Sequence, residues 1–115
     1  MSLINMKLYK DSEKYYDVKE KEAKNEDNII EFDIENINNM FEFQDYGCLF
    51  TRENDEFRFI LDTNEEEATY LLKETDTLLD IKVERCNFKR KKNQVIIEYQ
   101  LETDDCLNKI ELEIM

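Results

Sequence analysis

Two arginines, Arg52 and Arg85, stand in runs where apolar and polar residues alternate, and each shares its parity with apolar neighbours. Tyr70 and Tyr99 occupy apolar positions of two other such runs. If these positions face the inside of the fold, a buried arginine needs an acceptor, which a ligand carboxylate can supply. If both arginines lie at strand ends instead, they reach solvent and the tyrosine rings are ordinary core. The candidate ligand-binding residues are therefore Arg52, Tyr70, Arg85 and Tyr99.

A second group with chemical potential is the basic stretch 88–92. An aromatic ring beside cationic side chains can bind single-stranded nucleic acid by stacking and charge attraction. The same composition suits a lysine-rich hairpin tip that keeps a strand edge soluble, or a loop that docks onto an acidic protein surface, including a second copy of this chain. The residues of this candidate interaction loop are Phe88, Lys89, Arg90, Lys91 and Lys92.

The charge balance weighs against nucleic acid as the partner. Twenty-nine acidic residues against sixteen basic ones give a formal charge of −13. A field of that sign repels phosphate backbones. The sequence therefore predicts a small-molecule ligand, a protein partner or a homodimer rather than nucleic acid.

The residue types on which most enzymes depend are missing. The chain has no histidine, the commonest general base, and its single glycine, Gly47, excludes phosphate- and dinucleotide-binding loops. The acidic run 65–67 suits a charged turn, and residues 103–105 lack the ligand spacing of an EF-hand. We expect a protein without catalytic residues and without a cofactor.

Three cysteines, Cys48, Cys86 and Cys106, are widely spaced and form no CxxC pair. Without histidine, a zinc site would need all three thiolates and a carboxylate, which is an uncommon set. An odd number of isolated cysteines is typical of reduced thiols in a cytosolic protein. The sequence also shows no apolar run of about 18 residues and no signal-peptide pattern. We therefore expect a metal-free cytoplasmic protein that makes no membrane contact.

The elements that must position these groups have the two-residue period of β-strands. The clearest case is the run 94–115, where apolar positions share one parity in each half and residues 103–105 supply the turn of an antiparallel hairpin. The positions expected to be buried are Val95, Ile97, Tyr99, Leu101, Ile110, Leu112 and Ile114.

The same alternation predicts further strands upstream, over residues 29–37, 40–44, 48–52, 57–62 and 78–85. We expect a turn at Asn38 and Asn39, a bulge or bend at Gly47, and a basic loop over 87–93. Hydrophobic residues make up 41% of the 115-residue chain, enough for one domain with a core of its own. Short strands at about ten-residue spacing predict an antiparallel barrel or sandwich.

Two regions stay open between helix and strand. In residues 63–75, a capping-box pattern at Thr63 and Glu66 competes with strand-like alternation over 68–72. Near the N-terminus, residues 11–24 suit either a short solvated helix or a charged edge strand.

The order of features over residues 48–115 is also informative. Arg52 precedes a tight hairpin, Phe57, Arg58 and Phe59 open the next strand, and Tyr70 ends an Ala-Thr-Tyr triplet ahead of the final strands. This order resembles the uncharacterised bacterial YwiB-like family of small calycin-type, lipocalin-like β-barrel proteins. The chain departs from that family at 74–75, where Glu-Thr replaces the expected Tyr-Gly pair.

The resemblance implies a small antiparallel up-and-down barrel over residues 1–115, with 63–75 as a turn plus a strand. A short helix near the N-terminus remains the alternative there. The resemblance implies no activity, but a calycin-type barrel can enclose one small ligand. We expect a non-enzymatic protein that binds a small amphipathic or carboxylate-bearing ligand. The alternative is a protein-interaction module that uses its acidic surface or residues 89–92.

Overall fold

The chain folds into ten antiparallel strands without a helix, and the computed structural model describes all 115 residues. The strands are β1 (Ser2–Lys10), β2 (Glu13–Glu26), β3 (Ile29–Ile34), β4 (Ile37–Phe43), β5 (Cys48–Glu53), β6 (Phe57–Asp62), β7 (Glu67–Leu72), β8 (Thr77–Lys91), β9 (Gln94–Leu101) and β10 (Asn108–Ile114). Consecutive strands pair, and β1 also pairs with β10, which closes an up-and-down barrel. The predicted all-β barrel is confirmed. No helix long and apolar enough to cross a membrane is present.

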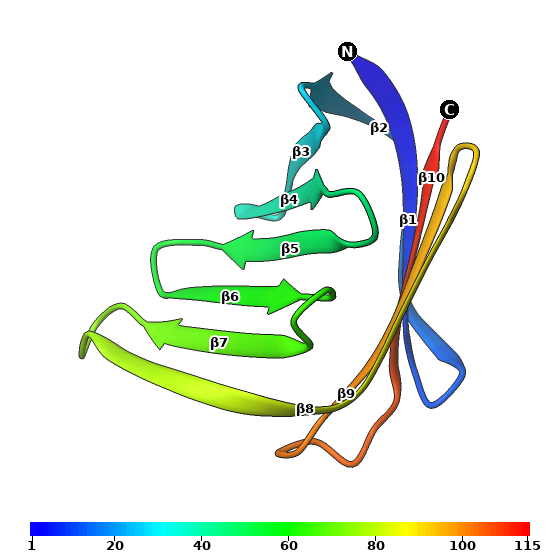
Figure 1. The fold of residues 1–115 in the computed structure, drawn as a ribbon. Coiled ribbons are helices and arrows are strands. Elements are labelled where there is room, and N and C mark those ends of the chain that lie inside the picture. Colours follow the sequence, from blue (N-terminus) through cyan, green and yellow to red (C-terminus); the bar gives the residue numbers. More distant parts are fainter.

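Two sheet regions make up the barrel wall and cross at a steep angle (Figure 1). The long strand β8 turns the corner between them, because residues 77–82 pair with β7 and residues 83–91 pair with β9. At the opposite corner β2 pairs with β1 and then, over its last residues, with β3. Residues 32–34 of β3 and 77–81 of β8 consequently have a backbone partner on one side only.

Several hairpins close through non-glycine residues with positive φ. The pairs at 11–12, 27–28 and 35–36 each place two such residues in succession, as in a type I′ turn. The turn predicted at Asn38 and Asn39 is therefore wrong, because the chain reverses three residues earlier, at Glu35 and Asn36. Asn39 lies inside β4 with its side chain fully buried.

Both regions left open between helix and strand prove to be strands. Residues 13–26 form β2, and residues 67–72 form β7 after a turn, so the helical alternatives are wrong. The predicted bend near Gly47 is confirmed at Asp45 and Tyr46. A Cβ at Gly47 would overlap the side chains of Thr63 and Asn64, so glycine is needed there for close approach.

The basic loop predicted over residues 87–93 is also wrong, because β8 continues through Lys91. A bulge between Val83 and Arg85 shifts the side-chain parity of β8 by one residue. Arg85 therefore pairs with Gln100 on the outer face instead of following Val83 inward. Cys86, whose partner is Tyr99, turns inward in its place.

Most of the core lies toward one end of the barrel, which we call the closed end, although Leu8, Asn39 and Ile110 are also buried near the other end. The closed end carries the β2–β3, β4–β5, β6–β7 and β8–β9 turns. Its nearly fully buried side chains include Ile4, Met6, Ile30, Phe41, Cys48, Phe50, Leu61, Val95, Ile97 and Leu112. Within the predicted C-terminal hairpin, Ile110 is also buried, whereas Tyr99, Leu101 and Ile114 are half-buried. We call the other end the mouth; it carries the remaining five turns.

Candidate functional site

Arg52 points into the mouth from the end of β5, because it shares its parity with the buried Cys48 and Phe50. Its cross-strand neighbours are Asn39 on β4 and Phe59 on β6. The Arg52 Nε donates a hydrogen bond to Asn39 Oδ1 at 3.1 Å. The three ion pairs of the molecule lie elsewhere. Arg52 is thus a half-buried cation without a carboxylate partner.

Asn39 holds the arginine in place. Its side chain is fully buried, and its Nδ2 donates to the backbone oxygen of Ile37 at 3.1 Å. The two hydrogen bonds fix the amide so that Oδ1 faces Arg52. Sequence reasoning missed Asn39 because adjacent asparagines suggest a turn. The available signal was its shared parity with Phe41 and Phe43.

Tyr99 reaches the same space from the opposite wall. Its ring packs against Phe59 with 6.3 Å between the ring centroids, and Phe59 is the cross-strand neighbour of Arg52. Burial raises the pKa of Tyr99, while the charge of Arg52 acts in the opposite direction. The hydroxyl therefore stays protonated at neutral pH. Since no buried side-chain oxygen lacks a partner and Tyr99 makes no hydrogen bond within the protein, its hydroxyl oxygen keeps some contact with solvent.

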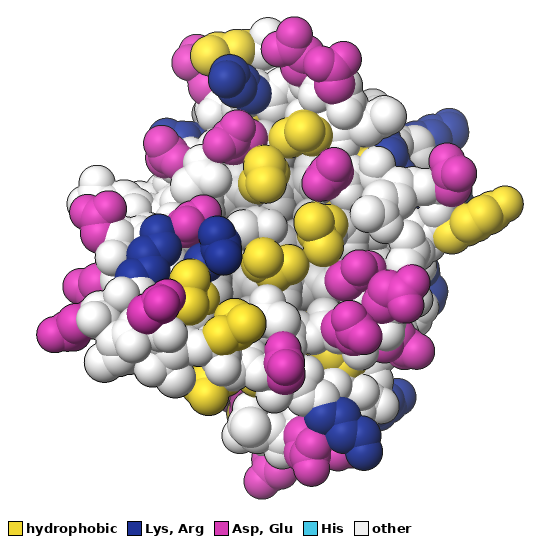
Figure 2. Space-filling model, turned by 60° about the vertical axis from the view of Figure 1, so that its left-hand side comes forward, with side chains coloured by type: hydrophobic (Ala, Val, Ile, Leu, Met, Phe, Trp, Pro, Cys, Tyr) yellow, Lys and Arg dark blue, Asp and Glu magenta, His cyan; other side chains and the backbone are white.

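Tyr70 forms the apolar wall of the mouth together with Phe57. Their rings stack with centroids 5.5 Å apart and an interplanar angle of 2°. Beyond them, Leu72 and Leu79 also face inward but remain 40% and 46% exposed. Figure 2 brings forward the side of the β5–β6 and β7–β8 turns and shows hydrophobic side chains in its middle, with acidic and basic ones around them. The mouth therefore exposes apolar side chains within a charged surface.

The remaining wall of the mouth is β2, from which Tyr16 faces inward. Burial raises the pKa of Tyr16, the charge of Glu35 adds to that rise, and the charge of Arg52 opposes it. Tyr16 consequently lies within electrostatic range of both Glu35 and Arg52. Glu35 directly follows the stretch of β3 that lacks a second strand partner.

The other predicted ligand-binding residue, Arg85, does not join this group. It is exposed on the outer face, where it lines a hollow with Glu66 and Glu98. The structure thus brings Arg52, Tyr70 and Tyr99 to the mouth and places Arg85 away from it.

The predicted interaction loop is divided between the two faces of β8. Phe88 packs half-buried against the core, so its ring is not free to stack on a base. The Arg90 guanidinium lies 4.2 Å from the ring centroid of Phe43 at the closed end. Lys89, Lys91 and Lys92 are exposed. The exposed part of the predicted interaction loop is therefore a group of lysines at the tip of the β8–β9 hairpin.

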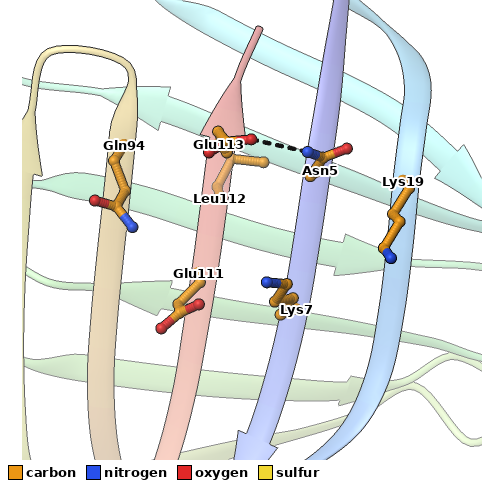
Figure 3. A pocket seen from close by; sticks show the side chains of 7 residues that line it. All are labelled: Asn5, Lys7, Lys19, Gln94, Glu111, Leu112 and Glu113. Carbon is orange, nitrogen blue, oxygen red and sulfur yellow. Dashed lines mark hydrogen bonds between the residues drawn. The ribbon is translucent and has the colours of Figure 1, made fainter.

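A separate hollow of about 110 Å³ lies on the outer face of β1, β2, β9 and β10 (Figure 3). Its basic side chains, Lys7 and Lys19, share the lining with Glu111 and Glu113. Asn5 Nδ2 donates to Glu113 Oε1 at 2.8 Å. The hollow has equal numbers of basic and acidic side chains. Its lining is almost wholly polar, as on an ordinary solvated sheet face.

The thiols offer no activated nucleophile. Burial raises the pKa of Cys48 to about 12 and that of Cys86 to about 11. A side-chain hydrogen bond with Asp104 raises the pKa of Cys106 to about 11. All three therefore stay protonated at neutral pH, whereas the thiolate is the reactive form.

Comparison with protein-family models, with curated proteins and with solved structures found no match for this chain.

Proposed function

We propose that the protein binds a small amphipathic molecule by its carboxylate at the barrel mouth. Arg52 carries this proposal, because its half-buried guanidinium has one hydrogen bond to Asn39 and no ion pair. A cation withdrawn from water is ordinarily paired. The remaining N–H groups of the guanidinium match the two oxygens of a carboxylate. Tyr99, whose pKa is raised by burial and lowered by the charge of Arg52, is a further candidate donor.

The ligand sits in the mouth rather than deeper in the barrel. Phe41, Phe50 and Leu61 are at most 1% exposed and fill the layer below Arg52. A head group therefore reaches no further than the Arg52 layer, and the stacked Phe57 and Tyr70 rings supply the apolar contact. Membership of the YwiB-like family is part of the same proposal, since its calycin-type barrel suits a small ligand.

The formal charge of −13 opposes an anionic ligand at long range. Exposed charges are screened beyond a Debye length, about 8 Å at 0.15 M salt, whereas a direct contact with Arg52 is screened much less. We therefore expect carboxylate affinity to rise from low to physiological salt.

The test is calorimetric or NMR titration with dodecanoate and with dodecanol. Arg52→Met keeps much of the apolar stem and deletes the charge. Leaving a bound carboxylate unpaired costs about 2–5 kcal/mol, so dodecanoate should bind at least about 30-fold more weakly. Dodecanol should bind wild type and variant alike.

Arg58→Met is the matched control, since Arg58 lies on the same end of the adjacent strand and pairs with Glu53 and Leu71 on the outer face. It should leave dodecanoate affinity unchanged. Absence of binding to the wild type, or equal losses in both variants, would overturn the proposal.

A second candidate, a protein-interaction module, rests on Lys89, Lys91 and Lys92. They are exposed at the β8–β9 hairpin and take part in no ion pair, on a chain that is otherwise strongly acidic. They suit an acidic surface, including that of a second copy. Sedimentation of wild type and a triple Lys→Ser variant tests the homodimer: a dimer lost in the variant and in high salt supports it, and a monomer throughout rejects it.

A further inference from the structure

Near its turn, the inner face of the β7–β8 hairpin carries two exposed leucines. Leu72 pairs with Phe57 and Leu79 pairs with Tyr70, so both leucines face the inside of the barrel. Leucine on an inner face is ordinarily buried, yet these two are 40% and 46% exposed. An apolar group bound at the mouth would cover them.

Beside these leucines, β8 is paired on one side only. Residues 77–81 of β8 pair with β7 and have no backbone partner on their other side. The wall closes at Lys82, whose backbone oxygen accepts a hydrogen bond from Glu102 N at 2.9 Å. Residues 77–81 therefore form an unpaired strand edge beside the mouth.

One row of side chains connects this strand edge with the arginine. The row is made of successive cross-strand partners on β5, β6, β7 and β8, which are Arg52, Phe59, Tyr70 and Leu79 in that order. Three strand spacings of about 4.8 Å separate the two ends of the row, so it spans about 14 Å. It begins with a cation held by an amide and ends with an exposed leucine, passing two aromatic rings.

We infer that the ligand is a single-chain carboxylate lying along this row, with its head at Arg52 and its tail over Tyr70 and Leu79. The inference rests on the proposed carboxylate site and adds the direction of the tail and the residue that sets chain-length preference. The unpaired charge at one end and the apolar face at the other match the two parts of such a molecule. The filled closed end leaves the tail no inward path.

A chain-length series tests the direction of the tail. Hexanoate, octanoate, decanoate and dodecanoate are titrated into the isotope-labelled full chain below their micelle concentrations, and backbone amide shifts are followed. Affinity should rise about twofold to fourfold per added methylene until the tail passes Leu79. Amides of β5 and β6 should respond to every probe, and amides near Leu79 only to the longer ones.

Leu79→Ser and Leu78→Ser form a matched pair. Leu78 is the next residue, pairs with Leu71 on the outer face and is 60% exposed. Leu79→Ser should weaken dodecanoate binding about tenfold and leave hexanoate unchanged. Leu78→Ser should change neither.

The outcomes separate the two proposals. Binding that depends on Arg52 but not on chain length or Leu79 overturns the tail inference and leaves the carboxylate site standing. Absence of any binding overturns both. A dimer in sedimentation that both leucine variants abolish would mean that a second copy covers the β8 edge, and would overturn the tail inference.

Discussion

The closed end and the mouth are built from the same strands with the same alternation, yet they bury their inner side chains to very different extents. At the closed end Phe41 and Leu61 are inaccessible to solvent. At the mouth Phe57 and Tyr70 are half-buried, and Leu79 is almost half exposed. The difference follows from strand pairing, because β3 and β8 lose one neighbour as they approach the mouth. One end can therefore hold the fold together while the other keeps apolar surface available.

Each end also carries one inward-facing arginine, with a different partner. Arg90 lies over the ring of Phe43 at the closed end, 4.2 Å from its centroid. Arg52 at the mouth is held by the buried amide of Asn39. An aromatic face satisfies the first cation locally, whereas an amide leaves the second without a counter-charge. This contrast, rather than apolar area alone, is the reason that we propose the mouth as the binding end.

The largest expected effect separates the ends by stability. Phe41→Ala removes a fully buried ring that packs against Phe32, Phe43 and Phe50, and should lower the free energy of unfolding by about 3–5 kcal/mol. Phe57→Ala removes the same group from the half-buried mouth and should cost about half as much or less. Urea denaturation measures both. Equal losses would contradict the division into two ends.

The next effect tests the polar pair at the mouth. Arg52→Met leaves the buried Asn39 Oδ1 without its donor and should cost about 1–3 kcal/mol. Combining it with Asn39→Leu should cost less than the sum of the two changes, because each alone breaks the same hydrogen bond. Arg90→Met, which removes an exposed cation–π contact, should cost only about 0.5–1 kcal/mol. Strict additivity of the first two changes would contradict the inferred role of Asn39.

The sequence predicted the residues of the mouth where a strand runs without interruption. Arg52 and Tyr99 were placed correctly because each shares its parity with buried residues of its own strand and no bulge intervenes. Arg85 was misplaced because a bulge shifts parity by one residue, and neither glycine nor proline marks that bulge. Alternation alone cannot detect such a shift, since both registers look regular over short stretches.

Asn39 shows a different limit of what can be predicted from the sequence. Asparagine tolerates positive φ in turns and also accepts hydrogen bonds inside proteins, so residue type alone does not separate the two roles. Here the two-residue turn falls on Glu35 and Asn36, which leaves Asn39 in register with Arg52. The barrel was predictable from local pattern, whereas the arginine's partner depends on cross-strand register.

The buried thiol of Cys48 at the closed end should make the stability of the protein depend on pH. Burial raises the pKa of this thiol from 9.0 to about 12, so the folded state retains a proton that the unfolded chain releases above about pH 9. Stability is therefore complete below pH 9 and falls as pH rises toward 12. Between pH 8 and pH 10 the wild type should lose about 1.4 kcal/mol more than Cys48→Ala. Urea denaturation at several pH values measures both proteins. If their free energies of unfolding change equally with pH, the closed end admits water to this thiol.

The smallest effect concerns backbone strain, which should be alike at both ends. Lys92 at the closed end has φ 53° and Glu35 at the mouth has φ 51°. An L-residue in this region is strained by about 1–2 kcal/mol, and glycine relieves the strain but loses more conformational entropy, by about 0.5–1 kcal/mol. Lys92→Gly and Glu35→Gly should each therefore raise the free energy of unfolding by about 0.5 kcal/mol, while Lys92→Ala should not. If Glu35→Gly destabilises the protein instead, the Glu35 carboxylate contributes to the mouth beyond its turn, and the ends differ in charge arrangement as well as in burial.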